Sequence, residues 1–174
     1  MQRPIIYYGN ALLRTQCKAV ERIDQQLIQL VNDMIETMDA SSGIGIAAPQ
    51  VGVGLRLFVL RNYLDDESNS LSAPLVYINP KIIKVSKEAE EDVEGCLSIP
   101  GLRAKVRRPS KITIEAMDLS GRVFTEEIEG YNARVRLHEN DHINGVLFID
   151  RLPARVKKKI EPELKVIKER FSSK

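Results

Sequence analysis

The sequence predicts a single α+β domain in which helices pack on mainly antiparallel strands. Amphipathic helical patterns lie near the beginning and at the end of the chain. Between them are short segments rich in β-branched residues, separated by polar or Pro- and Gly-containing stretches. The length of 174 residues lets one domain bury roughly two-thirds of the surface of its unfolded chain. We therefore expect one domain over 1–174, with a basic helical tail at about 153–171.

The composition is that of an ordinary globular protein, with 43% apolar and 29% charged residues. A net charge of +2 gives no reason to expect DNA binding. No run approaches the ~18 apolar residues of a membrane span, and the first residues lack the apolar core of a signal peptide. We therefore expect a cytoplasmic protein with no membrane partner. In that setting Cys17 and Cys96 are better explained as free thiols, ligands or nucleophiles than as a disulfide.

A first helix is expected over about 24–40, because Asp24 is a suitable N-cap and apolar residues then recur on one helix face. These are Leu27, Leu30, Val31, Met34, Ile35 and Met38. The next segment, GIGIAAPQVGVG at 43–54, contains four glycines and one proline. Such a composition disfavours a helix and favours extended chain that approaches another backbone closely. Taken alone, the segment is also explained by a plain glycine-rich connector.

Strands are expected at 56–61, 75–85, 111–117 and 122–129, which are rich in β-branched and apolar residues. Residues 62–74 have the composition of a surface loop, and a turn at 118–122 joins the last two strands as a hairpin.

The only two histidines, His138 and His142, lie four residues apart in LHENDHING at 137–145. Val135 and both histidines fit one face of a helix, and Gly145 is placed to end it. Residues four apart on a helix lie one turn above each other, so both imidazoles can bind one metal ion at ~2.1 Å. Glu139 would then lie near the open side of the ion. This arrangement predicts a catalytic metal site rather than a chance pair of histidines.

A catalytic site of this kind needs a third protein ligand. The metzincin spacing is excluded because Phe148 stands where the third histidine belongs. A downstream glutamate, Glu161 or Glu163, would make the protein an HExxH zinc metalloprotease, although both lie in a basic segment next to Pro162. Cys96, in EDVEGCLSIPG, is the remaining soft ligand and lies on a turn or strand end.

The last segment forms a second amphipathic helix, which Pro162 should bend or interrupt. Its apolar face consists of Val156, Ile160, Leu164, Ile167 and Phe171. Residues 151–174 hold nine Lys or Arg against three Glu, so the tail is basic. A solvated helix face is the usual explanation of such a pattern.

Three separated motifs resemble those of the peptide deformylases. GIGIAAPQ (43–50), EGCLS (94–98) and HENDH (138–142) occur in the order and at roughly the spacing of that family. The resemblance covers nearly the whole chain. It implies a peptide-deformylase-like α+β fold, with antiparallel sheets around a central HExxH helix. It also implies metal-dependent removal of the N-formyl group from the initiator methionine of new bacterial polypeptides, with release of formate.

The resemblance implies a role for each site residue. Cys96, His138 and His142 would be the metal ligands, with Fe2+ as the usual native metal and Zn2+, Ni2+ or Co2+ possible in purified protein. Glu139 would be the general acid/base for a metal-bound water nucleophile. The Gln50 side chain and the Leu97 backbone N–H would stabilise the oxyanion. Substrate contacts would come from Gly43, Ile44, Gly45, Arg103, Tyr131, Arg134 and Val135.

Two positions depart from the family pattern and bear on the pocket lining rather than the reaction. Leu137 precedes the first histidine where the family usually has Gln, and Ile143 follows the second where Leu is usual.

We expect a monomeric enzyme whose partner is the nascent N-formylmethionyl polypeptide. Some members of the family dock on ribosomal RNA near the exit tunnel through a basic C-terminal helix, and the tail at 153–171 offers a comparable charge. A catalytically inactive, deformylase-like binding protein is the alternative outside enzymes. Such a protein would be expected to lose Glu139, Cys96 or Gln50, and this chain keeps all three.

Overall fold

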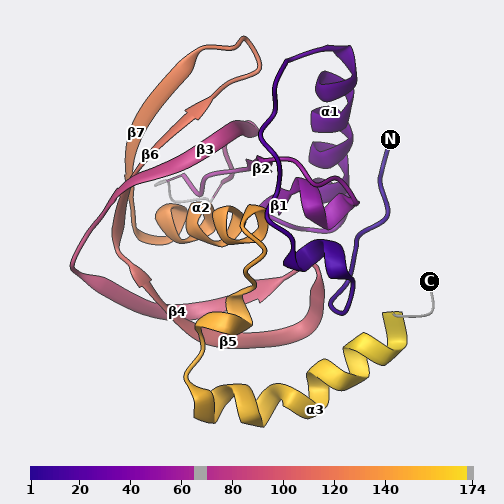
Figure 1. The fold of residues 1–174 in the computed structure, drawn as a ribbon. Helices are drawn as coiled ribbons and strands as arrows, with labels where there is room; N and C mark the ends of the chain where they lie inside the picture. The colour runs from indigo at the N-terminus through magenta and orange to yellow at the C-terminus, as the bar shows by residue number, and fades with distance from the viewer. Residues whose placement is uncertain (65–69, 172–174) are drawn as a thin grey trace.

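The computed structural model describes residues 1–64 and 70–171, and their secondary structure confirms the α+β prediction (Figure 1). The α-helices are α1 (Gln25–Ala40), α2 (Gly130–Ile143) and α3 (Ala154–Phe171). The strands are β1 (Gly45–Ala47), β2 (Leu57–Leu60), β3 (Leu75–Val85), β4 (Ala89–Cys96), β5 (Ile99–Pro109), β6 (Lys111–Met117) and β7 (Val123–Glu129). Part of the loop predicted at 62–74, residues 65–69, lies outside the described residues.

The strands form two antiparallel sheets. One has five strands in the order β1-β2-β3-β6-β7, and the other is the β4–β5 hairpin. Figure 1 shows α2 lying between the large sheet and the hairpin, with α1 beside the β1 edge. One apolar cluster joins α2 to the large sheet, a second lies under α1, and a third joins β5 to α3.

Local signals placed several element ends correctly. The Asp24 side chain accepts a hydrogen bond from the Leu27 N–H, as expected of an N-cap. Gly145 follows the end of α2 with φ of +72°, a left-handed conformation that favours glycine. The turn predicted at 118–122 is closed by a hydrogen bond from the Asp118 N–H to the Arg122 carbonyl, while the Arg122 N–H donates to the Asp118 side chain.

One local prediction was wrong in part. Residues 48–51 are not extended but form a short 3-10 helix (Ala48–Val51), which Gly52 ends with φ of +84°. Of the two outcomes predicted for Pro162, the structure has the bend: α3 continues through Pro162 without interruption and changes direction midway (Figure 1).

The sequence reasoning missed β4 and β5. Glu94 is the only fully buried residue of β4, so the strand lacks the alternation of apolar and polar residues that marks a half-buried strand. Acidic residues of β4 instead stand opposite basic residues of β5, as in the pairs Glu90–Arg108 and Glu91–Arg107. Cross-strand pairs of opposite charge stabilise such a hairpin.

Among the residues that the structure describes, no helix has the length and apolar character needed to cross a membrane.

Candidate active site

Two histidines and a cysteine converge where α2 meets the end of β4. The Nε2 atoms of His138 and His142 are 3.2 Å apart. Cys96, the last residue of β4, has its Sγ 3.3 Å from Nε2 of His142. Two nitrogens bound to one ion at ~2.1 Å with tetrahedral geometry are about 3.4 Å apart. The three side chains therefore form a group that could hold one metal ion.

The donor set fits a transition metal. A thiolate and two imidazoles suit iron, zinc, nickel or cobalt, whereas magnesium and calcium prefer oxygen ligands. The second ring nitrogen of His138, Nδ1, lies 2.9 Å from Oε2 of Glu94, so Nε2 is left facing the other ligands. Glu161 and Glu163, the alternative third ligands, are exposed on α3, and the ligand group found among the described residues contains neither.

Glu94 is the hub of a buried ion-pair network beside the ligands. Its carboxylate accepts hydrogen bonds from Nε of Arg108 (2.8 Å) and Nη1 of Arg134 (3.0 Å). Arg108 also donates to Asp141 on α2 (2.6 Å). Burial alone would raise the pKa of Glu94, but the hydrogen bonds and charges of Arg108 and His138 hold it well below its usual range. The network fixes both hairpin strands to α2 and orients the His138 ring.

Glu139 follows the first histidine and faces the cavity. Its side chain is buried, and Oε2 has no hydrogen-bond partner among the described residues. Burial raises the pKa of Glu139 to about 7, against the opposing charge of His138. A carboxyl group with such a pKa can both accept and release a proton near neutral pH.

Gly45 is required by the position of Glu139. A Cβ atom on Gly45 would lie 2.5 Å from Oε1 of Glu139, well inside contact distance. A Cβ on Gly43 would similarly lie 2.9 Å from the side chain of Leu97. The sequence predicts substrate contacts at these glycines, and the structure adds that they make room for Glu139 and Leu97.

Gln50 is held rigidly by the short helix at 48–51. Its Oε1 accepts a hydrogen bond from the Ala47 N–H (2.8 Å), which fixes the orientation of the amide. Its Nε2 then points towards the ligands, 3.2 Å from Oγ of Ser98 and 3.6 Å from Sγ of Cys96. The amide of Gln50 is thus a buried donor beside the group that could hold a metal.

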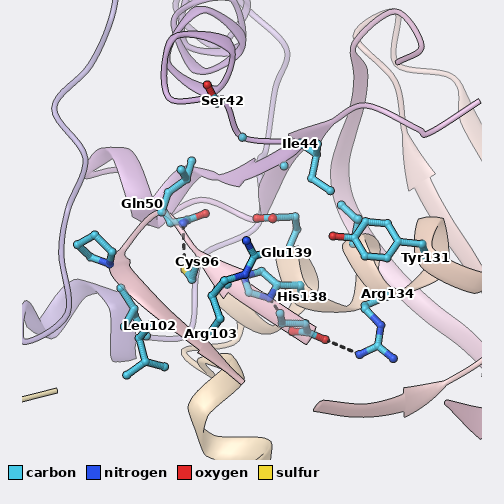
Figure 2. Close-up of a pocket in the computed structure, with 18 of the residues that line it drawn as sticks. Ser42, Ile44, Gln50, Cys96, Leu102, Arg103, Tyr131, Arg134, His138 and Glu139 are labelled. Atoms are coloured by element: carbon cyan, nitrogen blue, oxygen red, sulfur yellow. Dashed lines mark hydrogen bonds and ion pairs between the residues drawn. The ribbon is translucent and has the colours of Figure 1, made fainter. Parts of the chain in front are cut away.

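A cavity of about 600 Å³ opens in front of these residues (Figure 2). Every site residue predicted from the sequence lines it except His142, which is buried. The predicted residues in its wall are Gly43, Ile44, Gly45, Gln50, Cys96, Leu97, Arg103, Tyr131, Arg134, Val135, His138 and Glu139.

The sequence reasoning missed several residues of the site, of which Glu94, Ser98 and Tyr63 are examples. Glu94 stands inside the EGCLS motif, which could have pointed to it, but its partners are distant in sequence. Ser98, in the same motif, contacts Gln50. Tyr63 also lines the cavity, and nothing in its loop distinguishes it from other surface residues.

Comparison with known proteins agrees with this geometry. The family model described as polypeptide deformylase matches residues 2–158. The chain is 45% identical over 156 residues to a peptide deformylase of Borreliella burgdorferi, covering 90% of this chain and 91% of that protein. It is 46% identical over 151 residues to one of Dictyoglomus thermophilum, covering 87% and 93%. The crystal structure of a peptide deformylase from Legionella pneumophila matches with a TM-score of 0.86 at 37% identity, covering 100% and 99%. The chain therefore belongs to the polypeptide deformylase family.

Proposed function

We propose that this protein removes the N-formyl group from the N-formylmethionine of nascent polypeptides and releases formate. The observation that carries the proposal is the meeting of three distant motifs in one cavity. The motif at 43–50 supplies Gln50, the motif at 94–98 supplies Cys96, and α2 supplies both histidines and Glu139. These are the donors, ligands and proton carrier that hydrolysis of an amide requires.

Cys96, His138 and His142 would hold the metal, and we propose Fe2+ as the native ion, with Zn2+, Ni2+ or Co2+ able to replace it. When bound, a divalent ion supplies a Lewis acid and a water of lowered pKa. Oε2 of Glu139 has no hydrogen-bond partner in the part of the chain that the structure describes, and the pKa of the carboxyl group is near neutral. Glu139 would therefore take a proton from the attacking water and pass it to the amine nitrogen. The proton on nitrogen is essential because an amide anion is a very poor leaving group.

Two donors would bind the developing oxyanion of the formyl group. Nε2 of Gln50 faces the ligand group, and the backbone N–H of Leu97 follows Cys96 directly at the cavity wall. The peptide would run along residues 43–45, beside β1, which is an edge strand of the large sheet. An edge strand can pair with an added peptide backbone. Arg103, which also lines the cavity, would meet the downstream part of the substrate.

The proposal is tested by purifying the protein anaerobically, measuring its metal content, and assaying formate release from a formyl-Met tripeptide. About one iron per chain and formate release without cleavage of internal peptide bonds are expected. Internal cleavage would identify a metalloprotease. Absence of turnover with a fully loaded metal site would identify an inactive binding protein.

Replacement of Gln50 by alanine should lower kcat by ~100-fold or more, with a smaller effect on KM, because the lost donor matters most once the oxyanion has formed. Steady-state kinetics on the formyl-Met tripeptide measure both constants. Ser98→Ala is a matched control, since it removes a contact of Gln50 but no proposed oxyanion donor. A change confined to KM would instead mean that Gln50 binds the substrate in its ground state and does not stabilise the oxyanion.

We further propose that the cytoplasmic protein docks weakly on ribosomal RNA near the exit tunnel through α3. Lys157, Lys158 and Lys159 are exposed on this helix, as are Lys165 and Arg170. The opposite face of α3 packs on the protein body through Ile160 and Ile167. Truncation after Pro153 would therefore remove packing as well as charge, and neutralisation of exposed lysines is the sharper experiment.

The triple variant Lys157→Gln, Lys158→Gln, Lys159→Gln should lose salt-sensitive sedimentation with ribosomes, because contacts of basic side chains with phosphate weaken steeply as salt rises. Its activity on the tripeptide should stay within ~2-fold of the parent, since these residues do not line the cavity. Equal sedimentation of variant and parent at low salt would leave α3 a purely structural element.

A further inference from the structure

One end of the cavity is lined by Tyr63 and Tyr131, here called the aromatic wall, and neither ring has a part in the proposed reaction. The rings of Tyr63 and Tyr131 meet edge to face, with centroids 5.4 Å apart. Both side chains line the cavity, although each residue is 40% exposed. Figure 2 shows Ile44 pointing towards Tyr131 from the other side of the cavity. Two large aromatic rings and an aliphatic side chain thus surround this end of the site.

Tyr63 is held in place by its backbone rather than by its ring. The side chain of Asn132, on α2, accepts a hydrogen bond from the Tyr63 N–H and donates one to the Tyr63 carbonyl, both at 3.0 Å. One turn along α2, the wholly buried Arg136 donates to the side chain of Asn62 (2.9 Å). These bonds attach residues 62–63 to the helix that carries His138. These hydrogen bonds do not involve the Tyr63 ring, so they can still form when the ring is replaced.

The wall lies along α2 from the ligands, in the same cavity. Tyr131 precedes His138 by seven residues, which is ~10 Å along a helix, and Val135 lies between them at ~4.5 Å from His138. A long unbranched side chain that runs along α2 from the ligands would pass Val135 and extend towards the two rings. Arg134 offers it no free charge, because its guanidinium donates to Glu94 and to two backbone carbonyls.

We propose that Tyr63 is a specificity-determining residue, which together with Tyr131 selects the methionine side chain. The inference rests on the proposed deformylase function. A thioether contacts aromatic ring edges favourably, and the edge-to-face pair presents both a ring edge and a ring face. Tyr63 comes from a loop outside the three motifs, so it can tune the pocket without altering the reacting groups.

The test compares kcat/KM on formyl-Met and formyl-Ala tripeptides. Tyr63→Ala should lower kcat/KM on the formyl-Met peptide by ~2- to 10-fold, mainly through KM, because a sulfur–aromatic contact has about that effect. The formyl-Ala peptide does not reach the wall, so its rate should be unchanged. Tyr63→Phe should keep the Met-to-Ala preference of the parent. Leu64→Ala is the matched control, since Leu64 is similarly exposed but does not line the cavity.

The outcomes separate this inference from the proposed function. If the metal-loaded parent fails to turn over the formyl-Met peptide, the proposed function fails and the inference with it. If the parent is active and Tyr63→Ala keeps the parent's Met-to-Ala preference, only the inference is overturned. An equal loss on both peptides would also overturn it, because Tyr63 would then be a structural residue. Should Tyr63→Ala not fold, Tyr63→Leu, which keeps apolar bulk without a ring, gives the same comparison.

Discussion

Replacement of Glu139 by alanine should give a folded, metal-binding protein that has lost nearly all turnover. Glu139 is not among the group that could hold the metal, so that group remains complete. Its carboxyl group is buried, and one oxygen has no hydrogen-bond partner within residues 1–64 and 70–171, so removing it should not lower stability greatly. What disappears is the proposed proton carrier, and general acid–base catalysis typically contributes ~100- to 10,000-fold to a rate.

Glu139→Gln is the matched variant, because it keeps the shape of the side chain and removes only its capacity to carry a proton. Both variants should bind metal in the same ratio as the parent and unfold at a similar temperature, while kcat falls by at least ~100-fold. Formate release, metal analysis and thermal unfolding measure the three properties. Substantial turnover by the alanine variant would contradict the acid/base role of Glu139.

The histidine pair could be predicted because it depends only on residues that are close together in the sequence. Helical spacing alone places His138 and His142 on one face, and Gly145 marks where the helix ends. The surroundings of α2 could not be predicted in this way. The helix is buried on most sides, yet it carries Arg134, Arg136 and Asp141, so it shows no amphipathic pattern. Buried charges of this kind require partners from other elements.

The role of Glu94 could not be predicted because its partners lie far away in the sequence. Glu94 binds Arg108 from the neighbouring strand and Arg134 and His138 from α2, which are 14 to 44 residues away. A run of acidic residues with one buried member resembles a solvated segment until its partners are known. On chemistry alone Cys96 is already favoured as the third ligand over a downstream glutamate, because a thiolate suits an incomplete site of two histidines, and the resemblance to a known motif agrees. The structure brings its Sγ to the histidines through the β4–β5 hairpin.

Replacement of Cys96 by alanine should abolish metal binding and, with it, activity. Loss of a residue that only supports a ligand costs ~10- to 100-fold in metal affinity, so loss of a direct ligand should cost at least ~100-fold. The fold should remain, because Cys96 lies half-buried at a strand end while Glu94 still fixes the hairpin to α2.

The chain provides its own control in Cys17, the only other cysteine. Cys17 is a free thiol buried in the apolar cluster between α2 and the large sheet, and its backbone N–H donates to the Ile143 carbonyl. Cys17→Ala should therefore keep metal and activity and lose only a modest amount of stability, because a small cavity replaces the sulfur. Metal analysis after equilibration at limiting iron, with formate release on the same samples, separates the two variants. If Cys96→Ala retained a full complement of metal, the third ligand would have to be another residue, and a glutamate-ligated hydrolase would become the better assignment.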